Sequence, residues 1–189
     1  YNSKSLFGDY IHKYYYNASI KDGYTLRLIR EEIETQYRLK LQKALDDIEI
    51  LKGNADRVFV YSHAKFVEPM LDYIVKDLET ARIATGDFEI GGMVVCDSAP
   101  QARKMNEIFQ EKYADPKTKS ANGKRGVRTA QLILYDEGDK DTREDWVRDF
   151  KSGKLDLLFV YNMLLTGFDA ERLKKLYLGR VIKAHNLLQ

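Results

Sequence analysis

The sequence predicts an α/β fold built on a mostly parallel sheet with helices on both faces. Short apolar runs, MVVC (93–96), QLILY (131–135), LDLLFVY (155–161) and KLYLG (175–179), are separated by segments of helical periodicity or by turns. The first three runs are continuously apolar, as expected of strands buried on both faces. Strands of this kind that alternate with helices predict parallel pairing through crossovers.

The first part of the chain predicts a helical lead-in. Residues 26–51 carry apolar side chains at three- and four-residue intervals, which predicts an amphipathic helix ended by Gly53-Asn54. This helix could pack on the sheet or reach toward another domain. VFVYS (58–62) is rich in residues that favour β-strands and predicts an extended segment that leads into the domain. A second helical stripe runs from Phe66 to Leu78.

Capping signals place two helices between the strands. Ser98 with Pro100 supplies an N-cap and a first-turn proline for a helix that follows the first strand. Segment 115–128 is turn-forming and basic, which predicts a loop. Thr142 with Asp145 resembles a capping box and would open a helix that buries Trp146, Val147 and Phe150. The tail after the fourth strand predicts the start of another helix.

Bulk composition predicts a globular domain of a reducing compartment. The chain has 189 residues, of which 44% are hydrophobic and 32% charged, and no apolar run approaches membrane-spanning length. One cysteine, Cys96, excludes an internal disulfide. Without a signal or transit signature, we expect a cytoplasmic protein. The missing initial Met and the abrupt end at HNLLQ predict a piece of a longer chain.

Charge is distributed unevenly, although the net charge is only +2. Residues 101–128 hold eight basic and three acidic side chains, and residues 173–183 hold four basic and no acidic ones. Residues 136–149 hold seven acidic side chains against three basic ones. The basic segments could face phosphates, although a charge run is more often a solvated surface.

Sequence motifs for complete catalytic machinery are absent. The chain has no GxxxxGK[ST], GxGxxG or GxSxG motif, and its three histidines are far apart in sequence. Cys96 stands in an apolar strand, which favours a core role over a nucleophilic one. We therefore predict no catalytic residue and no metal site within this stretch.

A glycine-centred turn follows the third strand, in LLTGFD (164–169). Ligands of parallel sheets bind at the carboxyl ends of the strands, which is where we expect Thr166–Asp169 to lie. Gly167 would allow close backbone approach to a ligand, and Asp169 would accept hydrogen bonds from hydroxyls such as those of a ribose. The local pattern alone favours a plainer role, in which Asp169 caps the next segment.

Three segments resemble the motor of the restriction (R) subunit of type I restriction–modification enzymes. LLFVYNMLLTGFDAERLKKLYLGRVIKAHNLLQ (157–189) looks like the fifth helicase motif and the start of the sixth. GGMVVCDSAPQARKMNEIF (91–109) resembles the fourth-motif region, and SLFGDYIHKYYYNASIKDGYTLRLIREEIE (5–34) resembles the stretch that leaves the first motor domain. The LLTGFD block is the specific part.

The resemblance implies a fragment of an ATP-dependent, DNA-translocating superfamily-two motor. Residues 1–50 would be a lead-in after the first motor domain, and residues 51–189 a second RecA-like domain, truncated at its C-terminal end. ATP and Mg²⁺ would be held mainly by the first motor domain, so the fragment alone should bind neither and be inactive. Implied partners are double-stranded DNA, the first RecA-like and nuclease domains of the same chain, and the modification and specificity subunits, without a membrane.

Family roles carried over to this sequence define the candidate site. The nucleotide-binding residues would be Gly167, Asp169 and Gln189, the last opening the sixth motif. The DNA-binding residues would be Thr166 and Ser98, joined by Lys124 and Arg125 of the basic loop.

Two departures and one alternative stay open. Asn162 stands where relatives often carry Asp, and Glu171 where they usually carry Pro. The alternative function is a nucleic-acid-binding α/β module without a nucleotide site, based on loop 115–128 and on Tyr14–Tyr16, which could stack on bases. Tyrosines in packing roles are commoner.

Overall fold

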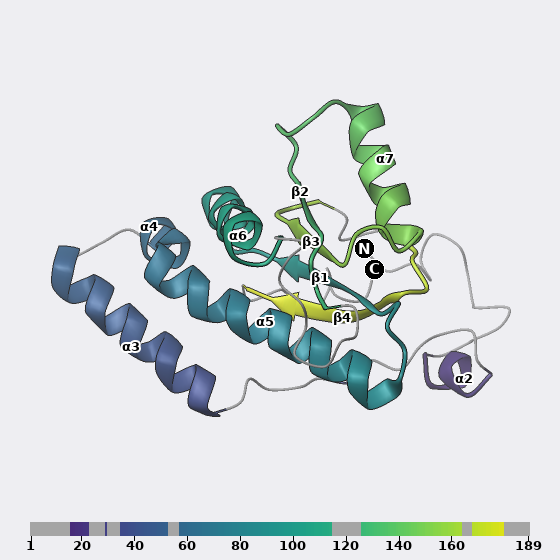
Figure 1. Ribbon diagram of the computed structural model, residues 1–189, viewed down its shortest axis with the longest axis horizontal. Helices are drawn as coiled ribbons and strands as arrows, with labels where there is room; N and C mark the ends of the chain where they lie inside the picture. The colour runs from purple at the N-terminus through teal and green to yellow at the C-terminus, as the bar shows by residue number, and fades with distance from the viewer. Residues whose placement is uncertain are drawn as a thin grey trace, which may run out of the picture. The chain divides into compact units, whose positions relative to one another are not determined.

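The computed structural model describes residues 16–22, 29, 35–52, 57–114, 126–163 and 168–179 (Figure 1). The chain divides into two compact units, residues 1–33 and 34–189. The first unit contains the short helix α2 (Tyr16–Lys21). The second contains the sheet and the five helices α3 (Thr35–Lys52), α4 (Arg57–Ser62), α5 (Ala64–Thr85), α6 (Ala99–Lys112) and α7 (Lys140–Lys151).

The sheet has four strands in the order β2-β3-β1-β4, and all three pairings are parallel. Its strands are β1 (Gly91–Val95), β2 (Ala130–Ile133), β3 (Leu157–Val160) and β4 (Leu173–Leu178). The four predicted strands are thus confirmed, with ends that differ by a few residues. Because the pairings are parallel, all four strands begin at one edge of the sheet and end at the other.

Successive residues of the central strands face opposite cores. Val94 of β1 and Phe159 of β3 lie in the core beneath α5 and α6. Their neighbours Met93 and Leu158 lie in the core beneath α7, which Phe150 completes. This period of two is that of a pleated strand, and its burial on both sides explains why the runs read as continuously apolar. The predicted fold class, a parallel sheet covered on both faces, is confirmed.

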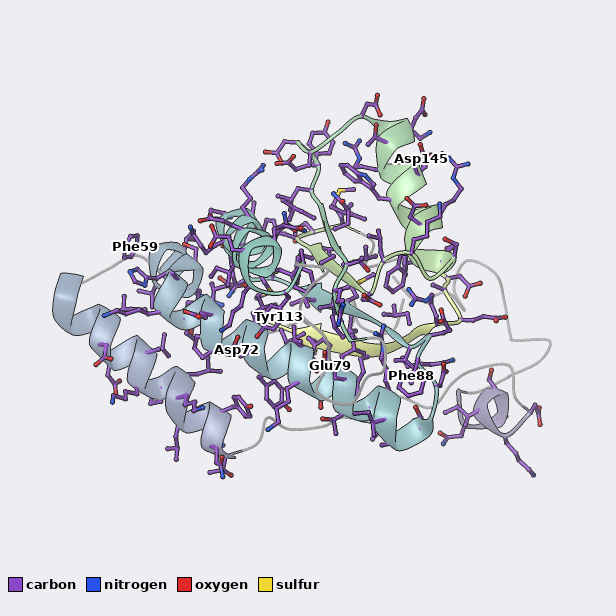
Figure 2. The ribbon with its side chains drawn as sticks, viewed as in Figure 1. Phe59, Asp72, Glu79, Phe88, Tyr113 and Asp145 are labelled. Atoms are coloured by element: carbon purple, nitrogen blue, oxygen red, sulfur yellow. The ribbon has the colours of Figure 1, made fainter. Side chains whose placement is uncertain are left out.

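A second helical layer lies outside α5. Within the described residues, helix α3 contacts α5 and α4. A small core joins them, in which Ile48, Val60 and Phe66 are buried. On the other side of α5, Asp72 accepts a hydrogen bond from the hydroxyl of Tyr113, at the end of α6 (Figure 2).

The expected extended segment at 58–62 is wrong, because these residues form α4. Its β-branched residues favour a strand locally. In a helix, however, Val60 reaches the small core between Ile48 and Phe66 and is only 6% exposed. Tertiary burial here outweighs an intrinsic preference worth a fraction of a kcal/mol, on the order of 0.5.

The capping box predicted at Thr142 is also wrong. Helix α7 starts earlier, and its N-cap is Asp139, whose carboxylate accepts a hydrogen bond from the Thr142 backbone N–H at 2.8 Å. Asp is as good an N-cap as Thr, and Gly138 with its φ of 64° supplies the turn before it. The predicted cap at Ser98 is confirmed, since its hydroxyl accepts from the Gln101 N–H at 3.2 Å.

Candidate functional site

The two edges of the sheet have different chemistry, and every described candidate residue lies at one of them. We call the edge where the strands begin the amino edge and the edge where they end the carboxyl edge. In Figure 1 the arrows of β1 and β4 point toward α4, which marks the carboxyl edge. The strands are four to six residues long, so the edges stand roughly 15–20 Å apart.

The amino edge is held by a buried ion pair. Arg82 of α5 and Asp156, which precedes β3, are each 1% exposed, and their Nη2 and Oδ1 atoms are 2.7 Å apart. The other carboxylate oxygen of Asp156 accepts from the backbone N–H groups of Arg128 and Thr129 and from the Thr129 hydroxyl. Arg82 also donates to the Ile90 carbonyl. These contacts tie together the starts of three strands.

The net effect of this environment is a lowered pKa for Asp156. Burial alone would raise the pKa of this carboxyl, but the Arg128 N–H and the Arg82 guanidinium outweigh burial. Both stabilise the charged form. Within the described part of the chain, Nη1 of Arg82 is buried without a hydrogen-bond partner. The pair is therefore a structural clamp with nearly all of its polar atoms used.

A second arginine closes the same edge. Arg172, just before β4, donates from Nε to the Glu89 carbonyl at 2.9 Å and from Nη1 to the Phe150 carbonyl at 2.8 Å. Nη1 also donates to the Leu155 carbonyl. The guanidinium lies 4.9 Å from the centre of the Phe150 ring. Arg172 thus joins the end of α7 to the starts of β1, β3 and β4.

Asp169 lies at this amino edge and not at the carboxyl edge, where it was expected. It lines a pocket of about 380 Å³ with Glu89, Gly153 and Arg172, which precede β1, β3 and β4. The neighbouring Phe168 packs against Phe150, their ring centres 5.9 Å apart. Strands β3 and β4 run in the same direction, so the segment between them must return from the carboxyl edge to the amino edge. Asp169 lies at the amino-edge end of this segment.

The Asp169 carboxylate is exposed in this pocket. Within the part of the chain that the structure describes, it makes no side-chain hydrogen bond or ion pair. The other charged groups of the wall are Glu89, Glu171, Lys151 and Arg172. An exposed, unused carboxylate can accept hydrogen bonds from ligand hydroxyls. The plain capping role would require a bond to a nearby backbone N–H, and none is present among these residues.

The carboxyl edge is organised around the turn after β1. Ser98 is 5% exposed, and its hydroxyl faces α6 as the cap, so its side chain is already used. Gln101 is fully buried, accepts from the Asp97 N–H at 2.6 Å, and donates to the Tyr61 carbonyl at 3.0 Å. Arg57, at the start of α4, pairs with Asp97 at 2.5 Å. The turn is thereby fixed to α4.

Two further polar groups extend along this edge. Tyr135, after β2, is 84% exposed, in a loop where Arg143 donates to three carbonyls, those of Tyr135, Glu137 and Gly138. Asn162, after β3, is exposed and has a φ of 54°. A left-handed conformation is tolerated by Asn better than by most residues.

Several predicted site residues lie outside the described residues. These are Thr166, Gly167, Lys124, Arg125 and Gln189, with Tyr14 and Tyr15 of the alternative function. The structure describes two of the predicted site residues, Asp169 and Ser98, and these two lie at opposite edges of the sheet.

The residues predicted to be inert have structural roles. Cys96 is fully buried, and His63 caps α5 by accepting from the Lys65 N–H at 3.2 Å. Among the residues that the structure describes, no group of three or more His, Cys, Asp or Glu side chains could hold a metal ion. No helix in these same ranges is both long and apolar enough to cross a membrane.

Arg57 was missed by the sequence reasoning. It follows a Gly-Asn turn and precedes a segment that was expected to be extended, so nothing local marked it. Its role depends on Asp97, 40 residues later in the chain. Arg57 and Asp97 have opposite charges, but many such pairs exist in a chain that is 32% charged.

The fold and the position of these groups define the class of protein. An all-parallel sheet with helices on both faces, and with polar groups gathered at its edges, is consistent with a RecA-like α/β domain. Domains of this architecture bind ligands beyond the strand ends.

Two comparisons give the family. Residues 127–189 match the family model described as type I restriction enzyme subunit R domain 3. The chain is also 24% identical, over 217 aligned residues, to the "Putative type I restriction enzyme MjaVIIIP endonuclease subunit" of Methanocaldococcus jannaschii. That alignment covers 95% of this chain and 21% of the archaeal protein. Both similarities are to subunits of type I restriction enzymes, and the resemblance seen in the sequence is confirmed.

Proposed function

We propose that this chain is the second RecA-like domain of the ATP-dependent, DNA-translocating motor of a type I restriction R subunit. It would supply part of the ATP site and part of the grip on duplex DNA. The family match over residues 127–189, which contain the Gly-Phe-Asp turn, is the observation that carries the proposal. The all-parallel sheet with helices on both faces supports the RecA-like architecture of this proposal.

In this proposal Asp169 contacts the ribose of ATP. Its carboxylate is exposed in the amino-edge pocket and is unused by other described residues, so it is available as an acceptor for hydroxyls. The pocket of about 380 Å³ falls in the range of small-molecule sites, although it is open on one side. The remaining walls of the ATP site, and the ligands for Mg²⁺, would come from the first motor domain.

Type I partners follow from the same proposal. The R subunit that carries this sequence would act with modification and specificity subunits, and its nuclease chemistry would reside elsewhere in the subunit. This chain alone should not hydrolyse ATP, because one side of a nucleotide cleft cannot position the γ-phosphate for transfer.

The test is Asp169→Ala in the full-length R subunit, assembled with its partner subunits on duplex DNA. A lost hydrogen bond that involves a charged acceptor is worth about 1.5–3 kcal/mol, so ATP affinity or DNA-stimulated turnover should fall roughly tenfold to a hundredfold. Glu171→Ala is the matched control in the same pocket wall and should change neither quantity by more than about twofold, as for ordinary surface substitutions.

Thermal unfolding of the 189-residue chain with the same two substitutions separates a binding role from a structural one. Asp169→Ala should leave the melting temperature close to that of the unchanged chain. A large drop in melting temperature, together with unchanged ATP hydrolysis in the full subunit, would show that Asp169 is a cap.

A further inference from the structure

Arg57 is a cation held in a fixed place at the carboxyl edge. Its side chain is 62% exposed, whereas the side chain of its partner Asp97 is only 9% exposed. The guanidinium carbon lies 5.4 Å from the centre of the Tyr61 ring, one turn further along α4. Arg57 is thus anchored from one side by a carboxylate and from beneath by an aromatic ring, while most of its surface faces solvent.

The anchor itself is rigid. Asp97 donates its backbone N–H to Gln101, and Gln101 donates to the Tyr61 carbonyl, so the four residues form a closed ring of contacts between α4 and the turn after β1. Gln101 is fully buried at the centre of this ring. A long, exposed arginine normally samples many rotamers, and this ring removes much of that freedom before any ligand binds.

The guanidinium has unused hydrogen-bonding capacity. Only Nη2 bonds to Asp97, and within the described residues Nε and Nη1 make no hydrogen bond. Planar guanidinium donors match the oxygens of phosphate groups and are often used in pairs. Because the Arg57 side chain is 62% exposed, solvent screens the ion pair and reduces its contribution to stability, whereas the 9% exposed Asp97 carboxylate keeps the guanidinium in place.

We propose that Arg57 binds a phosphate of the nucleic-acid backbone at the carboxyl edge. The inference rests on the proposed function and adds to it a DNA-contacting residue, next to the Ser98 turn. A phosphate of ATP has the same chemistry but is the wrong occupant here, because Asp169 lies at the opposite edge, roughly 15–20 Å away.

The test compares Arg57→Gln with Asp97→Asn in the full-length R subunit, by measuring affinity for a short duplex at several salt concentrations. Loss of one phosphate contact should weaken binding about threefold to tenfold and lower the salt slope by about 0.9. In Asp97→Asn the side-chain oxygen can still accept from Arg57, while the competing negative charge is lost, so DNA affinity should equal or exceed that of the unchanged subunit. If the Arg57–Asp97 pair served only to hold the fold together, weakening it from either side would disturb the same structure, and the two substitutions would weaken DNA binding equally.

Arg148 and Asp145 provide a matched control on α7. They form an arginine–aspartate pair whose two side chains are 74% and 58% exposed (Figure 2 labels Asp145), so this pair lacks the buried anchor of Arg57, and Arg148→Gln and Asp145→Asn should leave DNA binding unchanged. ATP affinity should be unchanged in Arg57→Gln. An unaltered salt slope in Arg57→Gln, or equal losses in Arg57→Gln and Asp97→Asn, would overturn the inference while the proposed function stands. An unchanged R subunit that binds no DNA would overturn the proposed function itself.

Discussion

The two edges of the sheet use their charged residues in opposite ways. At the amino edge Arg82 and Asp156 are buried, and their hydrogen bonds join the starts of three strands. At the carboxyl edge Arg57 is exposed and held by Asp97, and its remaining donors make no hydrogen bond to another described residue. Both edges contain an arginine–aspartate pair, but only the amino-edge pair is removed from water.

The buried pair is suited to stabilising the fold, whereas the solvent-facing arginine of the other pair is suited to binding a ligand. A charge pair that is buried loses its hydration and must be fully bonded within the protein, which leaves little for another molecule. A pair at the surface contributes little stability, but its unused donors can bind a ligand. Asp169 is the exception, because it lies at the amino edge, is exposed, and makes no side-chain hydrogen bond or ion pair with another described residue.

The largest expected effect is at the buried pair. Asp156→Ala would leave the Arg82 guanidinium charged and buried without its partner, which costs about 3–5 kcal/mol of unfolding free energy. Urea unfolding of the 189-residue chain measures it. Asp149→Ala is the control, because Asp149 pairs with Lys154 at the surface and its loss should cost about 0–1 kcal/mol. Similar losses for the two substitutions would erase the contrast between a buried and a surface pair.

A smaller loss is expected at the carboxyl edge. Gln101→Ala would leave the Asp97 N–H and the Tyr61 carbonyl without their partner, at a cost of about 1–3 kcal/mol. Glu111→Ala is the control, because Glu111 is exposed in the same helix, and its loss should stay within about 0.5 kcal/mol. The same urea titration applies. If Gln101→Ala cost as much as Asp156→Ala, the carboxyl edge would be as structural as the amino edge.

Much of the fold could be predicted from the sequence, because its determinants are local. Continuous apolar runs marked the first three strands, a shorter apolar run marked β4, and the Ser98 cap with Pro100 marked the start of α6. The predictions failed where distant residues decide the outcome. Val60 is helical because it packs on Ile48, and α7 begins at its own cap, Asp139, three residues before the Thr142 that resembled one.

The candidate site was less predictable for a geometrical reason. A turn that follows a strand was expected at the carboxyl edge, but the link from β3 to β4 has to return across the sheet, and the sequence does not show where along the link this happens. Asp169 lies at the amino edge, where the other residues of the pocket wall are 89, 151–153 and 170–172. The Arg57–Asp97 pair likewise joins positions 40 residues apart.

The smallest expected effect is a difference in acid sensitivity between the edges. Asp156 has a lowered pKa in the folded chain, against about 3.9 when unfolded. Its contribution to stability is therefore fully present above about pH 4 and is lost as pH falls through the folded pKa. Carbon NMR titration of the Asp156 carboxyl should give a midpoint below about 3.9, with unfolding free energy falling over the same range. A midpoint at or above that value would mean that burial outweighs the Arg128 N–H and Arg82, and that the amino edge is not the charge-stabilised clamp described above.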